Sequence, residues 1–202
     1  MSGFLQALAN PSIPFVRNAL IGSVLAAFLF GILGSLVTVR RIAGLAGAIS
    51  HTVLGGVGLA LFLASRGAPK WVSPMLGALV FAILAALLIS IVSLKAKQRE
   101  DTVINALWAI GMSLGVVFLA KTPGYVDPMS YLFGNILLVT EQDLFLLAVL
   151  DLVVLLLVGR YYRHIEAASF DEEFAATKGV PVTALYLVLL LVIAVAIVLL
   201  QT

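Results

Sequence analysis

Residues 40–63 read RRIAGLAGAISHTVLGGVGLALFL, an apolar segment that opens with two arginines and contains a single histidine. Five of its residues recur at helical steps of three, four, four and three, and therefore share one face of a helix: Gly44, Gly47, His51, Gly55 and Gly58. Small residues let another helix backbone come close, so this face is a candidate helix–helix contact. An ionisable group at membrane depth is costly, which makes His51 a candidate functional residue.

His51 has two interpretations. In the first, its ring hydrogen-bonds a neighbouring helix and tightens packing, and the glycines are simply a contact face. In the second, the ring lines a pathway for a divalent cation, because neutral imidazole is the commonest metal ligand in proteins. One histidine makes a weak metal site without a second ligand nearby in space, so the residue alone does not decide between them.

The composition is that of a membrane protein. Hydrophobic residues make up 62% of the chain and charged residues 11%, with a mean hydropathy of +1.17; soluble domains average about 25% charged residues. Apolar runs recur along all 202 residues and leave no room for a separate soluble domain. The absence of cysteine excludes disulfides and thiolate metal sites, and nothing in the charge pattern indicates nucleic-acid binding. We expect one all-α, polytopic transmembrane bundle over residues 1–202.

Six apolar runs are long enough to be membrane helices, which need about 20 residues each. Their predicted ranges are 18–39, 44–64, 73–94, 102–120, 143–158 and 181–201. The fifth is short for a complete crossing unless its flanking residues extend it. With Arg40 and Arg41 in the cytoplasm, eight Lys and Arg residues fall inside and four outside, which predicts an external N-terminus. An apolar stretch over 131–139 is too short to span and predicts a surface or re-entrant helix on the outer side, with Thr140 capping the next helix.

The predicted fourth helix opens with Glu100 and Asp101. Its residues at steps of four, three and four form one face with polar groups at the cytoplasmic end: Asp101, Asn105, Trp108 and Met112. Asp101 is suited to cap the helix, and the alternative is that the two acids receive or release a cation. Gly111 and Gly115 form a GxxxG pair on this helix, a pattern that indicates close packing.

Asp151 lies within the fifth apolar run. A carboxylate at the centre of a membrane helix costs roughly 2.5–3.5 kcal/mol on insertion scales, so the group must face protein, water or a partner charge. It is either a buried side chain, hydrogen-bonded or protonated, or part of an intramembrane polar site together with Asn105.

Residues 169–179 predict a short cytoplasmic helix that stands alone in a loop. Ser169 and Glu172 match a capping box, and Gly179 is suited to end the helix before Pro181. Asp171 and Glu173 add negative charge to its first turn.

Phe170 and Phe174 are four residues apart, so both are expected on one side of this short helix. Two exposed phenylalanines predict a docking site for another protein. The alternative is an interfacial helix with its rings in lipid, but so acidic a segment fits poorly against an anionic cytoplasmic leaflet.

No catalytic signature accompanies these features. The chain contains no G-x-x-x-x-G-K-[ST] motif, so it has no P-loop nucleotide site, and no H-E-x-x-H or serine–histidine pattern indicates a hydrolase. We therefore expect a transport protein rather than an enzyme. Its energy comes from a partner or from an ion gradient. In the latter case the chain is a self-contained channel or carrier that uses His51 and Asp151 as a relay.

Four motifs resemble, in order, those of the zinc/manganese ABC transporter permeases. They are residues 40–59 (RRIAGLAGAISHTVLGGVGL), 99–102 (REDT) with 111–115 (GMSLG), 131–139 (YLFGNILLV) and 169–181 (SFDEEFAATKGVP). The resemblance spans about residues 18–200. Family members continue through further helices, so we expect this chain to be truncated at its C-terminus.

The resemblance implies a homodimeric permease of a prokaryotic inner membrane that imports a divalent metal, whether zinc, manganese or iron. An extracytoplasmic metal-binding protein would deliver the metal, which is a substrate and not a bound cofactor. The helix at 169–179 would be the coupling helix, seated in a cytoplasmic ATP-binding subunit that hydrolyses ATP and drives alternating access.

The resemblance also implies that His51 lines the metal path. Many members carry an aspartate at the position of Gly47, so further ligands are expected from Glu100, Asp101 or the second copy. A permease of the related cobalamin and siderophore type is the remaining alternative.

Overall fold

The computed structural model describes residues 14–96, 100–124, 127–134 and 139–201, with side chains described except at 93–96, 100, 101, 128 and 133. Within these residues the chain is entirely helical outside its turns, as predicted. The described part of the chain contains eight helices: α2 (Pro14–Val39), α3 (Ala43–Ser65), α4 (Pro74–Ala96), α5 (Glu100–Lys121), α6 (Pro128–Phe133), α7 (Glu141–Phe170), α8 (Glu172–Thr177) and α9 (Val182–Gln201).

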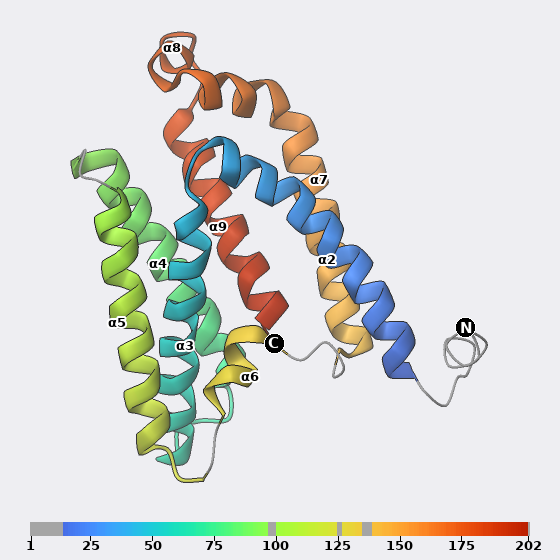
Figure 1. Cartoon of the computed structure of the whole chain (residues 1–202), viewed down its shortest axis with the longest axis vertical. Helices are drawn as coiled ribbons and strands as arrows, with labels where there is room; N and C mark the ends of the chain where they lie inside the picture. The colour runs from blue at the N-terminus through green and yellow to red at the C-terminus, as the bar shows by residue number, and fades with distance from the viewer. Residues whose placement is uncertain (1–13, 97–99, 125–126, 135–138, 202) are drawn as a thin grey trace.

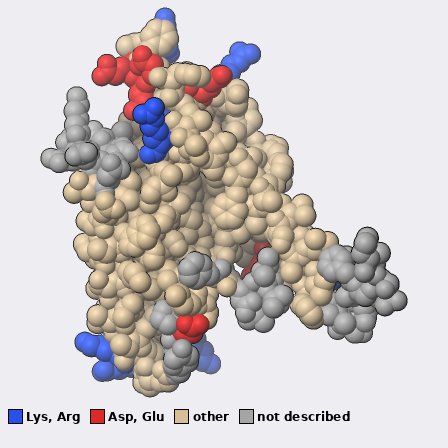
Figure 2. Space-filling view, viewed as in Figure 1, with Lys and Arg blue, Asp and Glu red and all other residues tan. Residues whose placement is uncertain are grey.

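Six of these helices are long and apolar enough to cross a membrane: α2, α3, α4, α5, α7 and α9. Figure 2 shows most of the visible Lys, Arg, Asp and Glu side chains at the two ends of the molecule, with a broad and nearly uncharged band between them. Many large apolar side chains are exposed on the long helices, among them Phe30, Leu152 and Leu156. Exposure of this extent indicates contact with lipid hydrocarbon. The predicted polytopic bundle is confirmed.

The long helices form two groups joined by α9 (Figure 1). On one side α3 packs against α5 and α4, and it is the most buried of the long helices. On the other side α2 and α7 lie against each other, while α9 contacts both groups. Short helix α8 stands beyond the long helices at the end of α7, and α6 lies near the end of α9.

The fifth membrane helix is much longer than the predicted range of 143–158. Helix α7 runs for 30 residues, Glu141–Phe170, and so is long enough for a full crossing. Its last twelve residues contain several charged and polar side chains, so a prediction based on apolar runs ended the helix too early. Thr140 is confirmed as its N-cap: Asp143 N donates to Thr140 Oγ1 at 3.2 Å, and Thr140 N donates to Asp143 Oδ2 at 2.9 Å. These reciprocal bonds form a capping box, which fixes the start of the helix.

The predicted outer-side helix is present but begins earlier than expected. Helix α6 starts after Asp127, whose Oδ1 accepts a 3.0 Å hydrogen bond from Met129 N, and it ends at Gly134 with a φ of +66°. An N-cap aspartate followed by proline is a strong start signal, which the predicted range of 131–139 overlooked. Of that range, residues 135–138 lie outside the described part of the chain.

Candidate functional site

The predicted glycine face of α3 lies against α5. A Cβ built on Gly55 would lie 3.0 Å from the carbonyl oxygen of Gly111, and one built on Gly58 would lie 2.8 Å from that of Gly115. Gly44 is in looser contact, 3.5 Å from Ile104 by the same measure. Glycine on both helices therefore brings the two backbones into contact, in the manner of small-residue interfaces in membranes.

His51 lies in the same contact and stacks on Trp108 of α5. The two ring centroids are 4.3 Å apart and the ring planes differ by 23°. A Cβ on Gly47 would lie 2.7 Å from Trp108 Cζ3, so the indole occupies the space that a side chain at position 47 would need. Trp108 therefore fills the space beside Gly47. Nδ1 of His51 is buried and has no hydrogen-bond partner among the described residues.

The other predicted metal-path residues, Glu100 and Asp101, are described by their backbone alone. Glu100 and Asp101 form the first turn of α5, but their side chains lie outside the described part. Asp101 precedes Trp108 by about two helical turns. Asn105 is exposed. No three His, Cys, Asp or Glu side chains in the described residues lie close enough to hold a metal ion. The described part of one chain therefore contains no complete metal site of this kind.

Asp151 is buried in a different part of the bundle. Its residue is 7% exposed, and neither carboxylate oxygen has a hydrogen-bond partner among the described residues. Helix α7 packs against α2 and α9, whereas the ring of His51 packs against α5. The structure therefore places these two groups in separate helix contacts, which does not favour a direct relay between them.

Removing the carboxyl group of Asp151 is expected to stabilise the protein. Asp151→Leu replaces a buried, unpartnered polar group by an apolar one of similar size, which typically gains about 1–3 kcal/mol. Thermal unfolding in detergent measures the gain, and Asp143→Leu, which breaks the capping box of α7, should lower stability in the same assay. A loss of stability in Asp151→Leu would show that the carboxyl group has a partner in the folded protein.

The short helix after α7 is present, but the predicted capping box is wrong. Ser169 lies inside α7, where its hydroxyl donates to Ile165 O at 2.6 Å. The N-cap of α8 is Asp171, whose Oδ1 accepts from Phe174 N at 2.9 Å. An aspartate directly before the acids is the better cap, since Glu172 and Glu173 then occupy the first turn.

Gly179 ends this region as predicted, one residue beyond the C-cap Lys178. Its φ is +81°, and Gly179 N donates to Ala176 O at 3.0 Å while Val180 N donates to Ala175 O at 3.1 Å. These two bonds form a Schellman motif, which requires the left-handed conformation that glycine adopts most easily.

Phe170 and Phe174 do not share one helix, contrary to the prediction. Phe170 is the last residue of α7, Phe174 lies in α8, and the chain changes direction at Asp171 between them. Both rings are nevertheless exposed, by 87% and 59%, at the end of the molecule where α8 stands. Nζ of Lys178 lies 5.4 Å from the centre of the Phe174 ring. The two phenylalanines remain a candidate docking surface.

An ion pair that the sequence did not predict joins this surface to the start of α3. Nη1 of Arg40 donates to Glu172 Oε1 at 3.1 Å, and the arginine side chain is only 7% exposed. Its guanidinium also lies 5.6 Å from the centre of the Tyr186 ring of α9. The next residue, Arg41, has a φ of 59° and makes the sharp turn into α3. The two paired residues are 132 positions apart, so only their opposite charges at the same end of the bundle pointed to the contact.

Comparison with known proteins agrees with this architecture. The chain is 39% identical over 190 residues to a "Probable metal transport system membrane protein" of Chlamydia trachomatis, with 93% of this chain and 64% of that protein covered. It is 33% identical over 193 residues to the "Manganese transport system membrane protein MntC" of Halalkalibacterium halodurans, with 95% and 64% covered. The chain thus spans just under two thirds of the length of these relatives.

A solved structure, "PsaBC from Streptococcus pneumoniae in complex with Fab", has the same fold. The TM-score is 0.79 at 28% sequence identity, and the match covers 100% of this chain and 69% of that one. The family model described as "ABC 3 transport family" matches residues 12–202. The chain therefore belongs to the ABC 3 transport family of membrane proteins.

Proposed function

We propose that this chain is the membrane-spanning permease part of an ATP-driven importer of divalent metal ions, a single transmembrane domain over residues 1–202. Manganese is the first candidate substrate, because relatives named for manganese transport align over nearly the whole chain. Zinc and iron share the preference for imidazole and carboxylate ligands and remain substrates to test. The observation that carries the proposal is the docking surface of α8, which is tied to the helix that bears His51.

His51 supplies one ligand of the metal path in this proposal. Its Nδ1 has no hydrogen-bond partner among the described residues and can bind a cation through its lone pair. Stacking on Trp108 fixes the orientation of the ring. The described residues form no cluster of three or more His, Cys, Asp or Glu side chains that could hold a metal ion. We therefore propose that Glu100, Asp101 or a second copy of the chain completes the coordination as the ion passes. The tight α3–α5 contact would keep the His51 ring in a fixed position relative to α5 during transport.

A cytoplasmic ATP-binding subunit is the proposed partner at α8, with Phe170 and Phe174 as apolar anchors. Asp171, Glu172 and Glu173 surround them with negative charge, and the Schellman turn at Gly179 fixes where α8 ends. Movement of α8 would reach α3 through the Glu172–Arg40 ion pair. ATP binding and hydrolysis on the partner would in this way open the His51 region alternately to the two sides of the membrane.

The remaining parts of the proposal follow from the charge distribution and the family. The α8 end carries Arg40, Arg41, Arg160, Arg163 and Lys178 and is proposed to face the cytoplasm, with the N-terminus outside a prokaryotic inner membrane. The opposite end would receive metal from an extracytoplasmic binding protein. Two copies of the chain would form the central pathway, with no permanently bound cofactor.

Metal uptake by a His51 variant tests the proposal directly. His51→Ala is expected to reduce ⁵⁴Mn²⁺ uptake by at least about tenfold, since loss of groups that support metal coordination commonly costs 10–100-fold in affinity or activity. The chain offers a matched control in its other histidine, His164 on α7, because His164→Ala leaves the α3–α5 contact intact. Both variants are compared at equal membrane abundance. Unchanged uptake in His51→Ala would exclude a metal-path role for the ring.

A further inference from the structure

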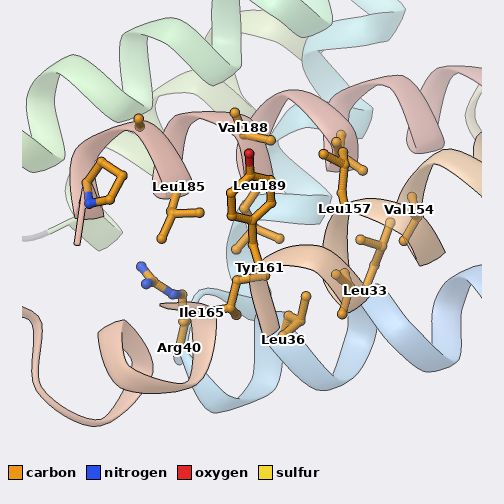
Figure 3. Close-up of a pocket in the computed structure, with 14 residues that line it drawn as sticks. Leu33, Leu36, Arg40, Val154, Leu157, Tyr161, Ile165, Leu185, Val188 and Leu189 are labelled. Atoms are coloured by element: carbon orange, nitrogen blue, oxygen red, sulfur yellow. The ribbon is translucent and has the colours of Figure 1, made fainter. Parts of the chain in front are cut away.

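An apolar cavity of about 280 Å³ lies between α2, α7 and α9. Figure 3 shows its walls: Leu33 and Leu36 come from α2, Leu157 and Tyr161 from α7, and Leu185 with Leu189 from α9. The cavity is separate from the His51 region, which lies between α3 and α5. Two wall residues are well exposed on the side of the bundle, Tyr161 and Val188, so the cavity opens toward the surrounding membrane.

Arg40 closes one end of this cavity, and Figure 3 shows its guanidinium directed toward Leu185. Its side chain is more than nine-tenths buried. Nη1 is occupied by Glu172, but Nε is buried and has no hydrogen-bond partner among the described residues. A guanidinium carries five N–H donors in a rigid fork that matches an anionic oxygen group. A buried donor left unsatisfied is costly, so an acceptor is expected there.

A second, polar hollow adjoins the cavity at the same arginine. It is lined by Arg40 and Arg41 together with Ser169, Glu172 and Tyr186, among others, and its volume is about 390 Å³. An apolar slot and a polar, arginine-lined hollow thus meet at one buried guanidinium. This is the arrangement that a molecule with an anionic head and a hydrocarbon tail would fill.

We propose that the cavity binds one anionic phospholipid from the leaflet at the α8 end. One acyl chain lies between α7 and α9, and the phosphate accepts hydrogen bonds from the Nε edge of Arg40, with Arg41 adding positive charge. Basic pockets between membrane helices on the cytoplasmic side are typical sites for anionic headgroups. The charge distinguishes this occupant from an apolar helix of another protein segment, which would leave Nε unsatisfied.

The bound lipid would stabilise the same arginine that pairs with α8. The phosphate and Glu172 would take opposite edges of one guanidinium, which fixes its position through two charge-assisted contacts. This inference requires neither the metal nor the ATP-binding partner, since the proposed site is formed by α2, α7, α9, Arg40 and its partner Glu172 of α8.

Native mass spectrometry of the purified full chain in neutral detergent tests the proposal. Phosphatidylglycerol and phosphatidylcholine with matched acyl chains are titrated separately. The wild-type chain is expected to retain one phosphatidylglycerol with about tenfold preference, because a charge-assisted contact discriminates by roughly that factor. Arg40→Gln should remove this preference, and Arg163→Gln, on an exposed arginine of α7 at the same end, should retain it.

A cavity-filling variant tests the acyl-chain part with Arg40 intact. Ala184→Phe puts a ring into the cavity and is expected to lower the affinity for both lipids by about tenfold. Val188→Phe fills the same space from an exposed position and serves as a second variant whose folding is less at risk. Retention of the phosphatidylglycerol preference in folded Arg40→Gln, or undiminished lipid binding in both phenylalanine variants, would overturn the proposal.

Discussion

Gly111→Leu is expected to separate α3 from α5 and to prevent the bundle from accumulating in the membrane. A Cβ at this position would lie 2.8 Å from Thr52 N and 2.9 Å from Thr52 Oγ1, so it meets backbone as well as side chain. Backbone within a helix cannot rotate away, and overpacking a tight contact costs about 1–3 kcal/mol or more. A four-carbon side chain should exceed that range. Membrane yield and the unfolding temperature in detergent measure the effect.

Gly34→Leu is the matched control, with the same substitution in another long helix. No atom lies within 4 Å of a Cβ built on Gly34, so the added side chain meets open space or lipid. Its yield and unfolding temperature should stay close to those of the wild-type chain. Equal destabilisation by the two substitutions would mean that the loss reflects a leucine in place of glycine in general, and not the α3–α5 contact.

The sequence was informative where a signal is local and repeats along a helix. Apolar runs gave six membrane helices, and the helical step of the α3 glycines gave the face that contacts α5. The same reasoning failed at the end of α7, because residues 159–170 continue that helix but contain charged and polar side chains that interrupt the apolar run. Length and apolarity identify the part of a helix inside the membrane, not the helix itself.

The residue at which a short helix begins was harder to predict, because more than one residue carried a plausible N-cap signal. Ser169 and Asp171 both precede acids at plausible spacing, and the choice depended on how far α7 extends. Because α7 continues through Ser169, its hydroxyl is used within that helix and the cap passes to Asp171. Phe170 and Phe174 then fall on different helices. An error in one helix boundary thus changed the interpretation of four residues.

Contacts between segments that are far apart in the chain could not be predicted from a single sequence. Nothing near Gly47 indicates that Trp108 fills the space beside it, and nothing near Arg40 indicates Glu172 as its partner. Both contacts depend on how whole helices pack. The Gly47–Trp108 complementarity explains in physical terms why position 47 has no side chain. It also shows that any further ligand for His51 must approach from another direction.

Phe174→Ala is expected to uncouple the chain from an ATP-binding partner while leaving the bundle folded. The ring is 59% exposed, so its removal costs little packing within the chain, and the Asp171 cap bonds to backbone and is unaffected. An aromatic anchor at the centre of an interface contributes about 2 kcal/mol, which corresponds to roughly thirtyfold in affinity. Co-purification of the ATP-binding subunit and ⁵⁴Mn²⁺ uptake should fall together.

Phe145→Ala separates docking from a general loss of exposed aromatic surface. Phe145 is also a well-exposed phenylalanine, but it lies in the second turn of α7, at the end of that helix opposite α8. Its replacement should leave both co-purification and uptake unchanged. Glu172→Gln, which weakens the ion pair with Arg40 but keeps both phenylalanines, should retain the partner and reduce uptake. If Phe174→Ala binds the partner as tightly as the wild-type chain, α8 is not the docking element, whatever the uptake of the Glu172 variant.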